Sequence, residues 1–278
     1  MRIGAHLRTP GGLRTAVDTA RAVGAEAAQL FISNPRAWSG PRLETAAKFG
    51  AEWRAGGIGP LFVHAPYLVN IASPNPEFLQ KSLALCVQSV RACGVLGSPG
   101  FVVHAGAGGP GEPAQAVERA TAVLRAILAE TPEETRPLVE LMAATSGAVA
   151  STVEEAARLF GAVGDERLGL VLDTCHLFAA GYALDEPEGV DALFDELRAS
   201  GLSGRLALVH LNDAKHERGS RRDRHEVVGH GSIGLAGFAA LLRRPEVRDL
   251  SLVVETPASG EARRAELERI RSLAPANV

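Results

Sequence analysis

Eight short runs rich in apolar and β-branched residues recur along the chain, and each is followed by a longer segment with helical spacing. The runs are RIGAHL (2–7), AAQLFIS (27–33), PLFVHA (60–65), GFVVHA (100–105), PLVEL (137–141), LGLVLD (168–173), LALVHL (206–211) and SLVVET (251–256). Strands that alternate with helices pair in parallel. Eight such units in 278 residues predict an α/β fold, a single (β/α)₈ TIM barrel domain spanning residues 1–278.

An open, doubly wound sheet is the competing architecture. Its nucleotide-binding forms carry G-x-G-x-x-G or a P-loop after a strand, and no run here is followed by either pattern. The segment 76–97 has apolar residues at 79, 83, 86, 87 and 90, which is the spacing of one helix face. No linker or low-complexity tract divides the chain. The closed barrel is therefore the favoured fold.

Composition narrows the class of protein. Hydrophobic residues make up 46% of the chain, which is enough for a large core. No stretch approaches 18 consecutive apolar residues, and the amino-terminal sequence lacks the apolar run of a signal peptide. The three cysteines, an odd number, argue against a disulfide framework. These features predict a cytoplasmic protein without a membrane partner.

Most of the predicted strands end on, or beside, a side chain that can bind a metal or move a proton. These side chains are His6, His64, His104, Glu140, Asp173, His210 and Glu255. The carboxyl ends of the strands in a (β/α)₈ barrel form one face, where active sites are built. Carboxylates and imidazoles crowded together without cations would repel or neutralise one another. The pattern therefore predicts a site for divalent metal ions on this face.

Two local spacings extend this set. In D-T-C-H, Asp173 ends a strand and His176 is placed in the following loop, so the two can bind neighbouring ions. In D-R-H, Asp223 and His225 can bind the same ion. Cys175 is interpreted as a small buried residue rather than a thiolate ligand. Without His6, nine candidate ligands remain: His64, His104, Glu140, Asp173, His176, His210, Asp223, His225 and Glu255. With one bridging carboxylate they are the number expected for three ions, and clustered ions are typical of in-line displacement at phosphorus.

Three longer motifs carry a resemblance to a known family. They are HAPYLVNIA (64–72), GLVLDTCH (169–176) and VHLNDAKHERGSRRDRH (209–225). They resemble the H-x-x-Y-hydrophobic-hydrophobic-N, D-T-C-H and H-x-N-D-[SA]-K…G-S-x-x-D-R-H motifs of the endonuclease IV family of apurinic/apyrimidinic endonucleases. The resemblance extends from Ile3 to Glu255. It implies a (β/α)₈ barrel that binds three zinc ions, although carboxylate–imidazole sites also accept Mn²⁺.

The resemblance also implies a ligand set for each ion. By matching positions, the first zinc is bound by His64, His104 and Glu140; the second by Glu140, Asp173, His210 and Glu255; and the third by His176, Asp223 and His225. Glu140 thus bridges the first and second ions.

The implied reaction is hydrolysis of the phosphodiester 5′ to an abasic site in duplex DNA, with trimming of blocked 3′ ends. Glu140 is the implied catalytic residue, since it also orients the attacking hydroxide. Four residues match positions that contact DNA. Arg36 and Trp38 follow the second strand, and Tyr67 and Leu68 match residues that enter the base stack. The expected partner is double-stranded DNA containing abasic sites, and a monomer is expected.

The net charge must be reconciled with a DNA partner. A formal charge of −3 by itself argues against nucleic-acid binding. Three bound Zn²⁺ ions would change this charge to +3. The loop 215–225 also carries five basic residues: Lys215, Arg218, Arg221, Arg222 and Arg224. A basic loop beside a metal site is a better predictor of phosphate contact than net charge.

Two alternative functions remain open. A sugar isomerase or epimerase of the same barrel class needs only Glu140, Asp173, His210 and Glu255, and the third ligand set argues against it. A non-catalytic barrel that binds metal or damaged DNA is the other alternative. Its support is Leu141, which stands where the family has asparagine and predicts weaker hydrogen bonding around Glu140.

Overall fold

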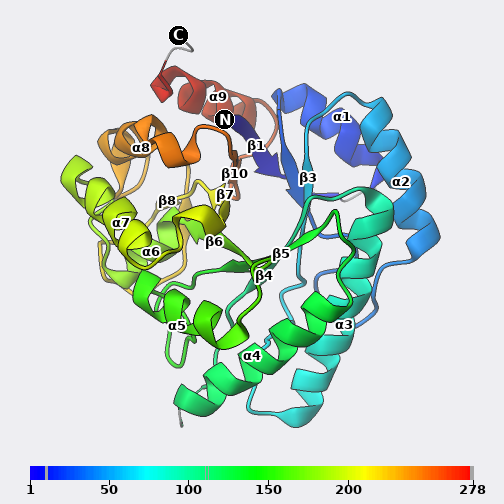
Figure 1. Ribbon diagram of the computed structural model, residues 1–278. Coiled ribbons are helices and arrows are strands. Elements are labelled where there is room, and N and C mark those ends of the chain that lie inside the picture. The colour runs from blue at the N-terminus through cyan, green and yellow to red at the C-terminus, as the bar shows by residue number, and fades with distance from the viewer. Residues whose placement is uncertain (10–11, 110, 112, 276–278) are drawn as a thin grey trace.

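The eight predicted runs each supply one strand of a closed parallel barrel in the computed structural model (Figure 1). The structure describes residues 1–9, 12–109, 111 and 113–275, so the end of the expected 1–278 domain lies outside it. The barrel strands, in spatial order, are β1 (Arg2–His6), β2 (Ala28–Leu30), β3 (Leu61–His64), β4 (Gly100–His104), β5 (Arg136–Glu140), β6 (Gly169–Asp173), β7 (Leu206–His210) and β10 (Ser251–Val254). The predicted TIM barrel is confirmed.

Helices surround the barrel on its outer side (Figure 1). They are α1 (Arg14–Val23), α2 (Leu43–Ala55), α3 (Pro76–Leu96), α4 (Pro113–Ala129), α5 (Val153–Val163), α6 (Thr174–Ala180), α7 (Pro187–Ala199), α8 (Gly234–Arg243) and α9 (Gly260–Leu273), with 3₁₀ turns at Ser203–Arg205 and Pro245–Val247. Local sequence sets several of their ends. The Asn75 side chain accepts a hydrogen bond from the Phe78 amide before α3, and Thr152 and Glu155 form a capping box before α5.

The barrel interior is filled by one apolar side chain from each of six strands. These residues pack together as a cluster separate from the main core: Phe62, Val102, Leu138, Val171, Leu208 and Val253. Each lies two positions before a predicted site residue, and side chains two apart on a strand share a face. The inward face of these strands therefore changes from apolar to polar at their carboxyl ends. Gly169 leaves space below this layer, since a Cβ there would lie 2.4 Å from Leu138 Cδ2.

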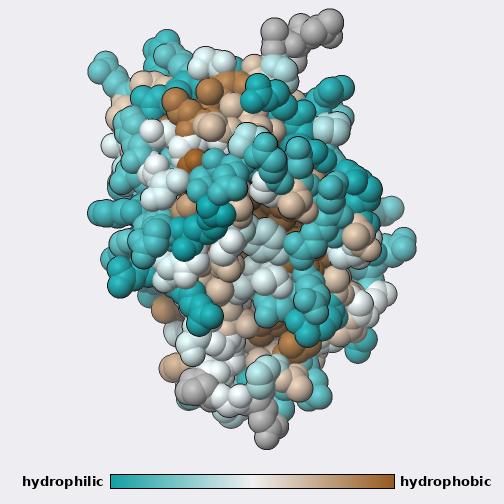
Figure 2. Space-filling model, turned by 90° about the vertical axis from the view of Figure 1, so that its left-hand side faces the viewer, coloured by the Kyte–Doolittle hydropathy of each residue, from teal (hydrophilic) through white to brown (hydrophobic). Residues whose placement is uncertain are grey.

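The main core lies between the outer faces of the strands and the helices. On α3, Cys86 and Val90 are buried, as the helical spacing predicted, and Leu79 and Leu83 are partly buried. Cys93 is also buried, and burial raises the pKa of its thiol to about 12. Hydrophilic side chains cover most of the face in Figure 2, and hydrophobic ones form small separate patches. Among the described residues, no helix combines the length and apolar character needed to cross a membrane.

Candidate metal centre

The nine predicted ligands converge at the carboxyl ends of the barrel strands. Within the described residues, their ligand atoms fall into groups whose members lie within 4.8 Å of one another. The groups are His64–His104–Glu140, Glu140–Asp173–His210–Glu255, His176–Asp223–His225 and Asp173–Cys175–His225. The first three are the same sets that the family resemblance implied.

Glu140 lies at the centre of this arrangement, and its side chain is fully buried. Its Oε2 atom is 3.0 Å from His64 Nε2 and 3.3 Å from His104 Nε2. Its Oε1 atom is 3.1 Å from His210 Nδ1 and 3.3 Å from His176 Nδ1. Burial raises the pKa of the Glu140 carboxyl, but the neighbouring imidazoles of His210 and His104 outweigh it and hold the pKa well below its ordinary value. Glu140 is therefore an ionised carboxylate whose two oxygens face different groups.

Two short elements complete the third group. His176 lies in the first turn of α6, not in a loop as its spacing predicted, because Asp173 Oδ1 accepts a hydrogen bond from the His176 amide and caps the helix. Strands β8 (Asp213–Ala214) and β9 (His225–Glu226) form an antiparallel hairpin that returns His225 to the barrel. The Asp223 carboxylate then lies between two rings, 3.3 Å from His176 Nε2 and 3.2 Å from His225 Nε2.

Backbone carbonyls set the tautomers of two histidines. His64 Nδ1 is 2.8 Å from the carbonyl oxygen of Ala65, and His176 Nδ1 is 2.8 Å from that of Leu141. A carbonyl only accepts, so Nδ1 carries the proton in both rings. In the neutral imidazole, Nε2 then presents its lone pair to the cluster, which is the arrangement that metal-binding histidines need. Leu141 thus contributes through its backbone, and its buried side chain offers Glu140 no hydrogen bond.

The carboxylates of the cluster raise the pKa of the histidines beside them. Burial lowers the pKa of His210, but the carboxylates of Glu255 and Glu140 outweigh it and raise the value to about 9. Burial likewise lowers the pKa of His225, but the carboxylates of Asp173 and Asp223 raise it to about 9. The carboxylates therefore need positive charge beside them, which protons or divalent cations can supply.

Three buried atoms of the cluster have no hydrogen-bond partner among the residues that the structure describes: Glu140 Oε1, His210 Nδ1 and His225 Nε2. Leaving such atoms unsatisfied costs about 1–3 kcal/mol each. All three belong to the predicted ligand set, and they are the oxygen and nitrogen donors that Zn²⁺ and Mn²⁺ bind. The residues present therefore fit divalent cations.

Cys175 is fully buried, as the sequence interpretation held. Its Sγ atom lies 3.6 Å from the carbonyl oxygen of Arg224, to which the thiol donates. Burial raises the pKa of this thiol far above its ordinary value, with a further contribution from Asp173. The group that contains Cys175 thus has a protonated sulfur, which is a poor metal ligand.

The four predicted DNA-contacting residues lie on surface loops. Tyr67 is 68% exposed and Leu68 is 37% exposed, and Arg36 is exposed as well. Trp38 is partly buried and stacks on Phe78, with ring centroids 6.3 Å apart. The side chains of Tyr67 and Leu68 are thus accessible from outside the protein.

Ring contacts connect Tyr67 with the metal centre. The Phe31 ring centroid lies 4.8 Å from that of Tyr67 and 5.7 Å from that of His64. Asn70 holds the loop itself: its Nδ2 donates to the Ala107 carbonyl at 2.8 Å, and its Oδ1 accepts from the Ala107 amide at 3.0 Å. The asparagine of the H-x-x-Y motif thus ties the loop after β3 to the loop after β4.

Sequence reasoning missed two side chains that hold the ligands. Asn212 donates to Asp173 Oδ2 at 2.6 Å and accepts from the Glu255 amide at 2.7 Å. Its place in the H-L-N-D motif was the available signal. Gln29 is fully buried and contacts His210 and Glu255. No sequence motif indicated Gln29, because a neutral amide within an apolar strand does not stand out as a site residue.

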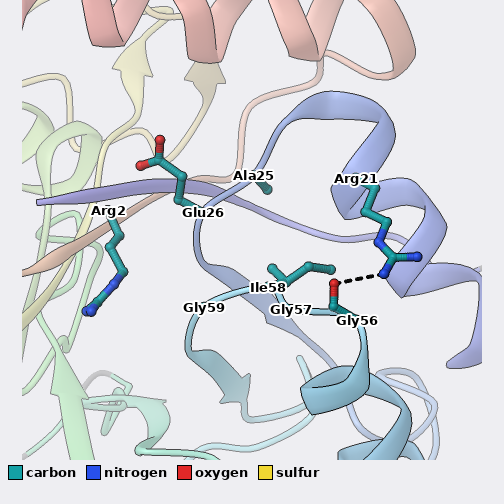
Figure 3. A pocket seen from close by; sticks show the side chains of 8 residues that line it. All are labelled: Arg2, Arg21, Ala25, Glu26, Gly56, Gly57, Ile58 and Gly59. Carbon is teal, nitrogen blue, oxygen red and sulfur yellow. Dashed lines mark hydrogen bonds between the residues drawn. The ribbon is translucent and has the colours of Figure 1, made fainter.

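A hollow lies at the opposite end of the barrel from this cluster, where the first strands begin. It is lined by Arg2, Arg21, Ala25, Glu26, Gly56, Gly57, Ile58 and Gly59. Figure 3 shows the Arg21 guanidinium donating to the Gly56 carbonyl. The lining contains one carboxylate and no histidine or cysteine, so it offers no comparable ligand set.

The fold and the ring of polar strand ends define a class of protein. The family model for the xylose isomerase-like TIM barrel matches residues 17–273. A probable endonuclease 4 from Methanoculleus marisnigri is 39% identical over 281 residues, covering 99% of each chain, and one from Chloroflexus aurantiacus is 38% identical over 98% of each. The crystal structure of endonuclease IV from Thermus thermophilus matches with a TM-score of 0.83 and 33% identity over 98% of each chain. The chain belongs to the endonuclease IV family, and it is an endonuclease.

Other barrels share the fold alone. A D-tagatose 3-epimerase-like protein matches with a TM-score of 0.78 but with 17% identity, covering 98% of this chain and 97% of that one. The same scaffold therefore accommodates different chemistry, and function must be argued from the site.

Proposed function

We propose that this chain hydrolyses the phosphodiester bond 5′ to an abasic site in duplex DNA, leaving a 3′-hydroxyl, and that it also trims blocked 3′ ends. The observation that carries the proposal is the third group, His176, Asp223 and His225, beside the two groups that share Glu140. Adjacent divalent-cation sites favour phosphoryl chemistry, because charge develops on both the attacking and the leaving oxygen.

Three Zn²⁺ ions are the proposed cofactors. The ligands would be His64, His104 and Glu140 for the first; Glu140, Asp173, His210 and Glu255 for the second; and His176, Asp223 and His225 for the third. Mn²⁺ fits the same nitrogen and oxygen donors. When bound, such ions act as Lewis acids that stabilise the charge on the phosphate and the leaving 3′-oxygen.

Glu140 is the proposed catalytic residue. Each carboxylate oxygen has two lone pairs, so Glu140 can hold the proposed cations and still accept a hydrogen bond from the attacking water. Among the described residues, its Oε1 atom has no hydrogen-bond partner. The low pKa of this carboxyl keeps it able to accept. Its contacts with four histidines hold the carboxylate in one orientation, which aligns the water with the phosphorus.

Arg36, Trp38, Tyr67 and Leu68 are the proposed DNA contacts. The exposure of Tyr67 and Leu68, on a loop tied down by Asn70, supports their insertion into the base stack beside the lesion. Exposed basic residues border the centre in the 215–224 loop: Lys215, Arg221, Arg222 and Arg224. Arg218 is less available to phosphate because it pairs with Asp185 and Glu186.

We further propose that residues 1–278 form one domain that acts on DNA as a cytoplasmic monomer. With three Zn²⁺ bound, the formal charge of −3 becomes +3. Long-range attraction to the DNA backbone then supports association.

The isomerase alternative is favoured by one observation, the group Glu140–Asp173–His210–Glu255, which alone matches the ligand set of those enzymes. The third group has no role in ketose–aldose chemistry. The non-catalytic alternative is favoured by Leu141, whose side chain offers Glu140 no hydrogen bond.

The deciding experiment incubates the zinc- or manganese-loaded protein with a duplex that contains one stable abasic analogue. We expect a single cut 5′ to the analogue and none in the undamaged duplex. His176→Asn is the matched variant, since it removes a ligand of the third group and retains the four residues shared with isomerases. It is expected to lose incision. Ketose–aldose activity without incision would support the isomerase, and binding without turnover at three metals per chain would support the non-catalytic barrel.

A further inference from the structure

Strand β2 differs from the other barrel strands at the carboxyl-end ring. Its residues, Ala-Gln-Leu, include no ionisable side chain and are followed by Phe31, whereas Glu255 follows β10. Gln29 is paired in register with His6 of β1, and its side chain is fully buried. At the position in β2 that corresponds to His6, the side chain is therefore a neutral amide.

The Gln29 amide contacts three side chains of the cluster. Its Nε2 atom donates to Glu255 Oε1 at 2.6 Å and lies 3.0 Å from His6 Nδ1. Its Oε1 atom lies 3.0 Å from His210 Nε2. The same amide therefore contacts two of the proposed ligands of the second ion, one with each of its polar atoms.

These contacts determine the direction of the amide and the tautomer of His210. An ionised carboxylate only accepts, so the atom beside Glu255 must be the amide nitrogen. The amide oxygen then faces His210 Nε2, and this ring nitrogen must carry the proton. In the neutral ring, the lone pair of Nδ1 is directed toward Glu140 Oε1 at 3.1 Å and Glu255 Oε2 at 3.3 Å.

We infer that Gln29 is a positioning residue for the second cation. It selects the His210 tautomer whose Nδ1 can bind metal, and it occupies Glu255 Oε1, so that Oε2 would be left to hold the same ion. The inference rests on the metal centre proposed above. Outer partners of this kind fix ligand orientation, and their loss costs about 10–100-fold in metal affinity.

The burial of Gln29 separates this role from DNA binding. Its side chain has 0% exposure and cannot touch a DNA duplex on the surface. Loss of the amide should therefore act on the bound metal and on kcat, and it should leave KM for DNA unchanged.

The test compares Gln29→Met, which is of similar size but cannot donate or accept at these atoms, with the wild type. Gln29→Glu is the second variant; it keeps an acceptor for His210 but places a carboxylate oxygen opposite Glu255. Thr135→Val is the matched control, because Thr135 is buried at the amino end of β5 and donates to the Ser98 carbonyl.

Circular dichroism shows whether each variant is folded. Zinc affinity is measured by chelator competition, and the coordination environment by the absorption spectrum of the Co²⁺-loaded protein.

We expect one of the zinc ions to bind about 10–100-fold more weakly in Gln29→Met and in Gln29→Glu, with an altered Co²⁺ spectrum, and Thr135→Val to match the wild type. Wild-type affinity and spectrum in either folded Gln29 variant would overturn the inference. If the wild type binds metal but does not incise abasic DNA, the proposed activity fails, and the metal readouts still decide the role of Gln29.

Discussion

The Nδ1 atom of His210 lies 3.1 Å from the Oε1 atom of Glu140, and neither atom has a hydrogen-bond partner in the described part of the chain. Both side chains are fully buried, so bulk water does not satisfy them. Two electron-rich atoms at this separation repel each other unless a proton or a cation offsets their charge. A cation bound at this pair would therefore both stabilise the folded barrel and take part in the proposed reaction.

Removal of divalent cations is expected to lower Tm. Without them, the carboxylates of Glu140, Asp173 and Glu255 are balanced only by protons on neighbouring imidazoles such as His210, and the binding free energy of the cations is lost. A cation present at 1,000 times its Kd stabilises the folded state by about 4.1 kcal/mol for each site. Calorimetry with and without EDTA measures the effect, and EDTA saturated with zinc is the control. An unchanged Tm in protein shown to have lost its metal would contradict the prediction.

Glu140→Gln is expected to abolish incision while the barrel stays folded. The amide has the same shape, but it lacks the charge that the surrounding histidines and the proposed cations require. Incision kinetics and circular dichroism measure the two effects. Glu26→Gln, at the opposite end of the barrel, is the control and should cut normally. Full activity of Glu140→Gln would exclude its role in orienting the attacking water.

Arg36→Ala is expected to weaken binding to abasic DNA more than it changes metal content. The exposed side chain lies outside the metal groups, and a lost phosphate contact reduces the salt dependence of log K by about 0.9. Fluorescence anisotropy at several salt concentrations and metal analysis test both parts. Arg91→Ala is the control, because Arg91 pairs with Glu130 on the helical surface. Equal effects of the two variants on DNA affinity would count against a specific role for Arg36.

Asn70→Ala is expected to weaken DNA binding without loss of metal. The variant removes the hydrogen bonds to Ala107 that hold the Tyr67 loop, at a cost of about 1–3 kcal/mol in stability. Asn75→Ala is the control, because loss of the α3 cap is expected to lower the free energy of unfolding by a similar amount, about 1 kcal/mol. Urea unfolding and anisotropy give the two readouts. A loss of DNA affinity in Asn75→Ala as large as that in Asn70→Ala would show a general stability effect.

Arg263→Met is expected to destabilise the fold by about 3–5 kcal/mol. Arg263 Nη1 lies 2.6 Å from Glu266 Oε2, and removing it leaves a buried carboxylate without its ion pair. The neighbouring Arg264→Met should change stability by less than about 0.5 kcal/mol, since that ion pair with Glu268 is exposed. The free energy of unfolding in urea compares the two. Similar values for both variants would exclude the proposed importance of the buried pair.

Much of the fold and of the metal centre could be predicted because the relevant signals are local. Apolar runs alternating with helical segments predicted all eight barrel strands. The two-residue period of a strand placed His64, Glu140 and Asp173 on the inward face, two positions after Phe62, Leu138 and Val171. Closure of the barrel then brought residues from distant parts of the sequence to one end.

The atomic pairings could not be predicted, because they depend on contacts between segments far apart in the chain. The start of α6 at Thr174 and the β8–β9 hairpin direct His176 and His225 to the same carboxylate.

By itself, the sequence determined the barrel, the end that holds the chemistry and the types of ligand, since strand period and strand order are encoded residue by residue. Only the tertiary structure decided which nitrogen of each histidine faces the cluster and that Gln29 and Asn212 hold its carboxylates. A neutral amide acquires such a role only when packing brings donors and acceptors within hydrogen-bond distance.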